Sequence, residues 1–132
     1  MLADGQLMAF VSTTDLDRAR EFYEDILGLS LVEQTPFACV FDVGGTPLRV
    51  TRAEAVEPAS YTVLGWIVAD IGREVLALAD RDVVFHRYDG MDQDSDGVWT
   101  TPNGDRVAWF SDTDGNVLSL TQFGHDGRVS DG

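Results

Sequence analysis

Residues 8–29 read MAFVSTTDLDRAREFYEDILGL, and this stretch decides the fold. It begins as a short run of apolar, β-prone residues and ends that run at Asp15, a residue type that caps helices. Gly28 lies where a helix C-terminal cap is expected. Between them the apolar residues have the spacing of one buried helix face; they are Leu16, Ala19, Phe22, Tyr23, Ile26 and Leu27. The stretch predicts a strand followed by a helix.

The same pattern returns in residues 63–70, which read VLGWIVAD and end at Asp70 before a second helical spacing. Residues 45–51 (GTPLRVT) likewise correspond to residues 115–121 (GNVLSLT). Each half has two more β-prone runs in between, at 29–34 and 37–43 in the first half and at 83–88 and 106–111 in the second. We therefore predict an α+β fold with two tandem βαβββ modules in one domain over residues 1–123. The modules would cover 5–52 and 61–123, with a linker at 53–60 and a flexible tail at 124–132.

The composition excludes several partners. The 132 residues fit one domain, and they carry 23 acidic residues against nine arginines and no lysine, for a net charge of −14 at pH 7. A field of this sign opposes binding to nucleic acids and to anionic membranes. We find neither a signal peptide nor an apolar run of the roughly 18 residues that a membrane span needs. With a single cysteine, Cys39, we expect a cytoplasmic protein without nucleic-acid or membrane partners.

Two segments resemble the vicinal oxygen chelate superfamily, which includes glyoxalase I, extradiol dioxygenases, bleomycin-resistance proteins and fosfomycin-resistance enzymes. They are DLDRAREFYEDILGL at 15–29 and WFSDTDGNVLSL at 109–120, and the resemblance extends over about residues 7–123. One departure is Thr113, where the family commonly has proline, but the flanking Asp and Gly residues should preserve the turn. The resemblance implies two curved sheets that form a U-shaped cleft. It also implies a homodimer.

Members of this family that use a metal place His, Gln or Glu on the first and last strand of each module. The corresponding positions here are Met8, Arg49, Val63 and Ser119. Divalent cations of the kinds used by enzymes prefer carboxylate, imidazole or thiolate ligands, and these four side chains offer none. We therefore expect no metal and no other cofactor, an inference that depends on strand register.

The residues expected to line the cleft are mostly apolar with a few polar anchors, as in small-molecule sites in general. Arg49 faces either an anionic group of a ligand or a surface carboxylate, and the sequence leaves both open. Trp99 follows an acidic loop and is placed where it can close over a ligand. The full set of predicted ligand-binding residues is Met8, Phe10, Arg49, Thr51, Val63, Trp99, Ser119 and Thr121.

Three other features have a structural reading and a functional one. Residues 92–97 (DQDSDG) match the start of an EF-hand calcium loop, but Asn103 stands where the bidentate Glu belongs, so we favour a solvated turn. We interpret His86 as a structural or cleft-edge histidine. Cys39 alternates with Phe37 and Phe41, and we interpret it as a buried, unreactive thiol.

We therefore expect a small-molecule-binding protein of the bleomycin-resistance kind, without catalytic metal. The first alternative is a lyase, isomerase or dioxygenase of the same superfamily, with a metal-free site or displaced ligands such as His86. The second is an interaction subunit whose cleft is filled by its own side chains. Whether the protein is an enzyme stays open, because one fold supports many functions.

Overall fold

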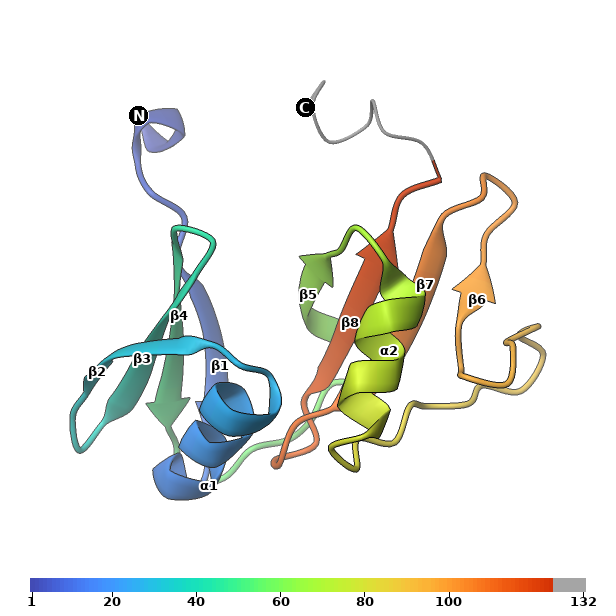
Figure 1. The fold of residues 1–132 in the computed structure, drawn as a ribbon. Coiled ribbons are helices and arrows are strands. Elements are labelled where there is room, and N and C mark those ends of the chain that lie inside the picture. Colours follow the sequence, from blue (N-terminus) through green and yellow to red (C-terminus); the bar gives the residue numbers. More distant parts are fainter. Residues whose placement is uncertain (125–132) are drawn as a thin grey trace. The chain divides into compact units, whose positions relative to one another are not determined.

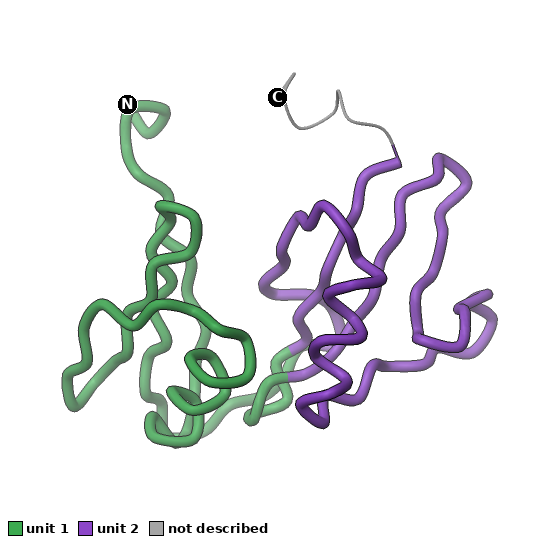
Figure 2. Tube along the Cα trace, viewed as in Figure 1, with its two compact units in different colours: residues 1–59, 112–116 green, residues 60–111, 117–132 purple. Residues whose placement is uncertain are grey.

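The computed structural model describes residues 1–124, and Figure 1 shows their elements. The contacts divide the chain into two compact units, each built around one βαβββ module. The first unit contains residues 1–59 and 112–116, and the second contains residues 60–111 and the chain from 117 onward (Figure 2).

The first unit is a four-stranded sheet with one helical segment. Its strand order is β1-β4-β3-β2, in which β1 runs parallel to β4 and the other pairs are antiparallel. A short 3₁₀ turn, η1, precedes β1, and the helical segment consists of an α-helix, α1, that continues as a π-helix, η2. The bounds are η1 Leu2–Asp4, β1 Ala9–Thr13, α1 Leu16–Arg20, η2 Glu21–Ile26, β2 Ser30–Gln34, β3 Ala38–Val43 and β4 Thr46–Arg52.

The second unit repeats this plan with the order β5-β8-β7-β6, in which β5 runs parallel to β8. Its fourth strand, β6, has only two residues. The bounds are β5 Thr62–Ile67, α2 Ile71–Ala79, β6 Trp99–Thr100, β7 Arg106–Ser111 and β8 Val117–Gln122. The predicted α+β class and the two βαβββ modules are therefore confirmed.

Both helices begin as the repeat predicts. The carboxylate of Asp15 accepts a hydrogen bond from the backbone N–H of Arg18 at 3.2 Å, and Asp70 accepts one from Arg73 at 3.1 Å. Each cap satisfies a helix N–H that has no intrahelical partner. Gly28 ends the first helical segment with a φ of +76°, a conformation that favours glycine. The predicted helix over 16–27 differs in one respect: from Glu21 onward its turns are wider than α-helical ones.

One face of each sheet packs on its helix and forms the core. In the first unit the completely buried side chains include Tyr23, Phe41 and Val50, and in the second they include Ile71, Phe110 and Leu118. Burying a large aliphatic or aromatic side chain contributes about 1.5–3 kcal/mol each. The side chains on the helix-covered faces therefore form the core, and those on the opposite faces are available to bind other molecules.

The segment 83–88, predicted as a strand, is irregular, and this prediction was wrong. The side chain of Gln93 takes the hydrogen bonds that a neighbouring strand would make: its Oε1 accepts from the N–H of Tyr88 at 2.8 Å, and its Nε2 donates to the carbonyl of His86 at 2.9 Å. Among the backbone groups of the segment, the N–H of His86 bonds to β7, at the carbonyl of Trp109. The short β6 occupies the remaining edge of β7 instead.

The turn Asp112–Asn116 between β7 and β8 belongs to the first unit by its contacts (Figure 2). The buried carboxylate of Asp112 accepts hydrogen bonds from the hydroxyl of Tyr23 at 2.6 Å and from the N–H groups of Asp114 and Asn116. Burial, followed by the nearby Asp112 carboxylate, raises the pKa of Tyr23 well above its usual value. The Tyr23 hydroxyl therefore stays protonated and donates at all ordinary pH values.

Asp114 in the same turn is held by two threonines. Its carboxylate accepts hydrogen bonds from the hydroxyl groups of Thr13 and Thr14 and from the N–H of Thr14. Burial alone would raise the pKa of Asp114, but these hydrogen bonds outweigh it and lower the pKa below its usual value. The turn closes with the N–H of Gly115 on the carbonyl of Asp112 at 3.1 Å, so it survives Thr113 in place of proline, as predicted.

Candidate functional site

The open face of the first sheet carries the four residues predicted there. Phe10 pairs with Arg49 across the parallel β1 and β4, and Thr51 lies two residues further on the same face. Met8 precedes β1 with the same alternation, and it is exposed like Phe10, whose side chain is 60 % accessible. The structure thus places all four on the face opposite the helix. Whether they contact a ligand stays a prediction.

Arg49 lies between two apolar neighbours on this face, Phe10 on β1 and Val40 on β3. It is half-buried, and within residues 1–124 its guanidinium forms no ion pair with a carboxylate. A half-buried arginine without a protein anion is suited to hold a carboxylate or phosphate from outside the chain.

The second sheet places its predicted residues less uniformly. Thr121 and Trp99 both pair with Val107, so they share the face opposite α2. Ser119 lies on this face too, but only 8 % of it is accessible, and a Cβ atom at its partner Gly65 would lie 2.9 Å from the serine hydroxyl. Val63 falls at a register shift between Thr62 and Leu64, where it has no partner on β8. The register argument therefore holds for Ser119 but not for Val63, because a β-bulge displaces the ladder there.

A cavity of about 280 Å³ adjoins this face of the second unit. Its lining is aromatic and apolar, with the hydroxyl groups of one serine, one threonine and two tyrosines and no charged side chain: Ser60, Tyr61, Thr62, Tyr88, Met91, Trp109 and Val117. None of these residues was predicted from the sequence. The prediction of a strand over 83–88 assigned Tyr88 to a sheet and not to a cavity wall. Nothing in the sequence indicates that Met91 and Tyr61 lie near Trp109.

Aromatic rings fix the orientation of Trp109 beside the cavity. The ring of Tyr88 meets it edge-on, with centroids 5.3 Å apart and planes at 88°, and Trp99 stacks on it at 6.3 Å and 29°. These are the geometries that aromatic pairs prefer. Trp99 thus packs against Trp109, and its closure over a ligand stays a prediction.

His86 lies at the edge of the same region. Its Nε2 is 2.8 Å from the hydroxyl oxygen of Ser111, and its Nδ1 is 3.2 Å from the hydroxyl oxygen of Tyr88. Because a neutral imidazole has one donor and one acceptor nitrogen, it links the two hydroxyl groups in either tautomer. This arrangement fits the interpretation of His86 as a structural or edge histidine. It also leaves an acid–base group beside a cavity residue.

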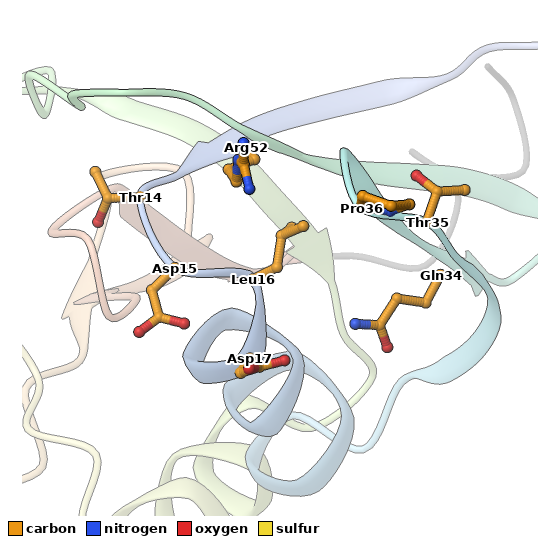
Figure 3. Close-up of a pocket in the computed structure, with 8 residues that line it drawn as sticks. All are labelled: Thr14, Asp15, Leu16, Asp17, Gln34, Thr35, Pro36 and Arg52. Carbon is orange, nitrogen blue, oxygen red and sulfur yellow. The ribbon is translucent and has the colours of Figure 1, made fainter.

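The first unit has a hollow of its own, about 330 Å³ in volume and more polar (Figure 3). Its charged side chains are Asp15, Asp17 and Arg52. Asp15 is already engaged in capping the helix, and Gln34 accepts a hydrogen bond from Arg20 at 2.6 Å. The remaining lining residues are Thr14, Leu16, Thr35 and Pro36. With its best polar groups occupied, this hollow is a weaker candidate than the aromatic cavity.

Cys39 is not a candidate nucleophile. Its side chain is completely buried on the helix-covered face, and burial raises the pKa of its thiol. A thiol that stays protonated is a poor nucleophile. Phe41 shares this burial, whereas Phe37 precedes β3 and is exposed, so the predicted alternation fails at Phe37.

The residues at the family's metal positions do not fit a divalent cation. Met8 offers only a thioether, Val63 offers nothing, and Arg49 brings a positive charge. Ser119 contributes one neutral hydroxyl, close against Gly65. Over residues 1–124, moreover, His, Cys, Asp and Glu side chains form no group of three able to hold a metal ion.

The two βαβββ units define the class of fold to which the protein belongs. The sequence profile of the Glyoxalase/Bleomycin resistance protein/Dioxygenase superfamily matches residues 5–120, so the chain belongs to that superfamily. No curated protein matches the sequence. No helix in residues 1–124 is long and apolar enough to cross a membrane.

Solved structures with the same fold have diverged far in sequence. A superfamily member from Sphaerobacter thermophilus is 23% identical, with a TM-score of 0.71 over 92% of this chain and 99% of that one. Lactoylglutathione lyase from Agrobacterium tumefaciens is 18% identical, with a TM-score of 0.70 over 90% and 93%. A fosfomycin resistance protein from Listeria monocytogenes is 12% identical, with a TM-score of 0.71 over 90% and 93%. At such identities the likeness shows the fold and leaves the activity open.

Proposed function

We propose that this protein binds a small organic molecule without a catalytic metal. The observation that carries the proposal is the cavity of the second unit, which combines three aromatic side chains and a methionine with a serine and a threonine hydroxyl. Small-molecule sites are typically apolar with a few placed polar groups. The donor set at the family's metal positions supports the second half of the proposal, because it lacks carboxylate, imidazole and thiolate.

Metal analysis of protein purified without chelator tests the metal-free part. We expect only trace metal, whereas roughly one tightly bound Zn, Ni, Fe or Mn ion per chain, the stoichiometry of a catalytic site, would contradict the proposal. A variant with one metal-ligating side chain gives a second measurement. The metal content of Ser119→Glu should stay at trace level, because the other three positions still offer no suitable donor.

A thermal-shift screen tests binding. Antibiotics, aromatic acids and thiol conjugates are screened with and without divalent metals, and a compound that binds the folded state raises Tm by mass action. For any hit, Met91→Ala and Tyr61→Ala should reduce the shift, because both residues line the cavity. Phe37→Ala in the first unit is the matched control, since Phe37 is equally exposed but lies outside the cavity. A hit that survives both cavity variants places binding elsewhere.

A second candidate function, metal-free acid–base catalysis, is favoured by the position of His86 between the hydroxyl groups of Ser111 and Tyr88. An imidazole so placed can move a proton to or from a molecule held beside Tyr88. If the screen gives a ligand that is converted, His86→Gln should abolish conversion while leaving binding nearly unchanged. Binding without any conversion supports the binding protein.

The remaining proposals concern the setting of the protein. We propose a homodimer, on the family resemblance alone, and a cytoplasmic location, on the single cysteine, which cannot form a disulfide within the chain. Light scattering after size-exclusion chromatography tests the first: a mass of one chain at micromolar concentration contradicts it. Cell fractionation tests the second.

A further inference from the structure

The cavity of the second unit offers π faces and no charge. Tyr61, Tyr88 and Trp109 line it together with the polarisable sulfur of Met91, and none of its lining residues carries a charged side chain. The face of an aromatic ring has a negative electrostatic potential that attracts cations, and tryptophan is the strongest of the three rings in this respect. An arginine or lysine in the lining would repel a cationic guest, and none is present.

The π surface of Trp109 is held in place before any ligand arrives. Tyr88 contacts its ring edge-on and Trp99 stacks on it, while the hydroxyl of Tyr88 is itself tied to His86. A rigid aromatic surface binds without the entropic cost of ordering its side chains. The site is therefore prepared for a guest that recognises ring faces.

Carboxylates surround the segment that forms one wall. Asp89 directly follows Tyr88, Asp92 directly follows Met91, and both aspartates are exposed. The nearby arginines are turned to the loop itself: Arg87 donates to the carbonyls of Asp94 and Ser95, and Arg106 lies 3.8 Å from the carboxylate of Asp94. The loop thus keeps a net negative potential close to the cavity.

From these observations we infer that the cavity takes organic cations, that is, an apolar or aromatic frame with a quaternary or protonated amine. The inference rests on the proposed binding function and narrows it to one class of ligand. The ring faces would hold the cationic group at short range. The aspartates would attract it at longer range, an effect that salt screens.

Three probes with one ring frame separate charge from shape: N-methylquinolinium, quinoline (neutral at pH 7.5) and quinoline-6-carboxylate. Titration calorimetry on the full chain at low and high salt gives their dissociation constants. We expect the cation to bind about three- to tenfold more tightly than the neutral ring, by the usual strength of cation–π contacts, and the anion to bind most weakly. High salt should reduce this preference.

Variants assign the effect to the cavity. Trp109→Leu should weaken both the cation and the neutral ring, and it should weaken the cation more, because the cation also loses its cation–π contact. Asp89→Asn combined with Asp92→Asn should weaken only the cation, by about two- to fivefold at low salt. The matched control removes two exposed charges from the first unit, Glu21→Gln with Asp25→Asn, and should leave the preference unchanged. Circular dichroism and Tm verify that each variant is folded.

The outcomes separate this inference from the function on which it rests. If the neutral ring binds as tightly as the cation, or the anion binds more tightly than either, the organic-cation inference is overturned while small-molecule binding stands. If none of the three probes binds the folded protein at millimolar concentration, the inference is overturned and the binding proposal loses its support at this cavity. A cation preference that the aspartate pair reduces and the control pair does not supports the inference.

Discussion

The two units fill the same position of their parallel strand pair in opposite ways. In the first unit this position holds Phe10 opposite Arg49, and in the second it holds Gly65 opposite Ser119. The first sheet thus presents two large side chains on its open face. The second presents almost none there, and the aromatic residues beside it come from the irregular segment 83–98 and from β7. The two sheets therefore share one topology but not one kind of open face. In the first sheet the strands supply the large side chains, whereas in the second a loop supplies part of them.

The β3–β4 and β7–β8 hairpins also differ, in the hydrogen bonds that one aspartate makes at each turn. Substituting these aspartates should give the largest difference in stability between the two hairpins. Asp112 is buried with four hydrogen bonds, whereas Asp42, its counterpart near the end of β3, is exposed and accepts one, from Gly45. Asp112→Ala should cost about 3–4 kcal/mol of unfolding free energy, because it leaves buried hydrogen-bond donors without an acceptor. Asp42→Ala should cost about 0.5–1 kcal/mol. Chemical denaturation measures both, and equal losses would show that the two turns are equivalent.

The small pair of the second sheet gives the next largest effect. Gly65→Ala places a Cβ atom 2.9 Å from the hydroxyl of Ser119, and we expect a loss of about 1–2 kcal/mol. The double variant Gly65→Ala with Ser119→Ala should recover most of this loss, because it removes the atom that clashes. Phe10→Ala in the first sheet should change stability by less, since that side chain is mostly exposed. If the double variant recovers no stability, the new Cβ atom clashes with the backbone of Ser119 and not with its hydroxyl.

Asp114 predicts a pH dependence for the turn. Its pKa is lower in the folded protein than in the unfolded chain, so its contribution to stability is present above the unfolded pKa and is lost as pH falls through the folded one. Asp114→Asn should therefore flatten the loss of stability between neutral pH and acid, and at pH 7 it should cost about 1–2 kcal/mol through weaker hydrogen bonds. Thr14→Ala, which removes one donor, should give an intermediate slope. Denaturation curves recorded across the pH range measure it.

The smallest effect concerns two threonines that differ in the hydrogen bonding of their hydroxyl groups. The hydroxyl of Thr113 is buried without a hydrogen-bond partner in the part of the chain described, whereas that of Thr35 accepts hydrogen bonds from the N–H groups of Phe37 and Ala38. Thr113→Val should stabilise the protein by about 1 kcal/mol, and Thr35→Val should destabilise it by a similar amount. Thermal unfolding of the two variants gives opposite shifts in Tm. A loss on Thr113→Val would indicate an ordered water at this hydroxyl.

The fold was predictable because its determinants are local. Asp15 and Asp70 cap helices through their own backbone neighbours, and the turn around Gly115 uses residues adjacent in sequence. Part of each motif that carries the family resemblance proves to be structural: the hydroxyl of Tyr23 donates to Asp112, and Asp114 accepts from Thr13. The second motif also contains Trp109 and Val117, which line the cavity, but the motif does not show which residues meet them there.

The candidate site was only partly predictable, because its residues meet through long-range contacts. Alternation along regular strands placed Met8, Phe10, Arg49 and Thr51 on one face correctly. The same rule failed at Val63, where a bulge interrupts the ladder, and it said nothing about Tyr61, Met91 or Tyr88, which lie in irregular backbone. A glutamine whose side chain takes the hydrogen bonds of a neighbouring strand, as Gln93 does, cannot be recognised from the sequence.

That glutamine has a consequence for how such proteins change over time. Gln93 holds the backbone of His86 and Tyr88, and also bonds to the carbonyl of Gly97, so the loop closes on itself through one side chain. The ladder of β5, β8 and β7 takes no hydrogen bond from Gln93, whereas Phe85 and His86 of the same segment contact β7. Substitutions in segment 87–97 that keep these two contacts would therefore change the wall of the cavity while the sheet keeps its pairing, which offers such proteins a route to a different ligand within one fold.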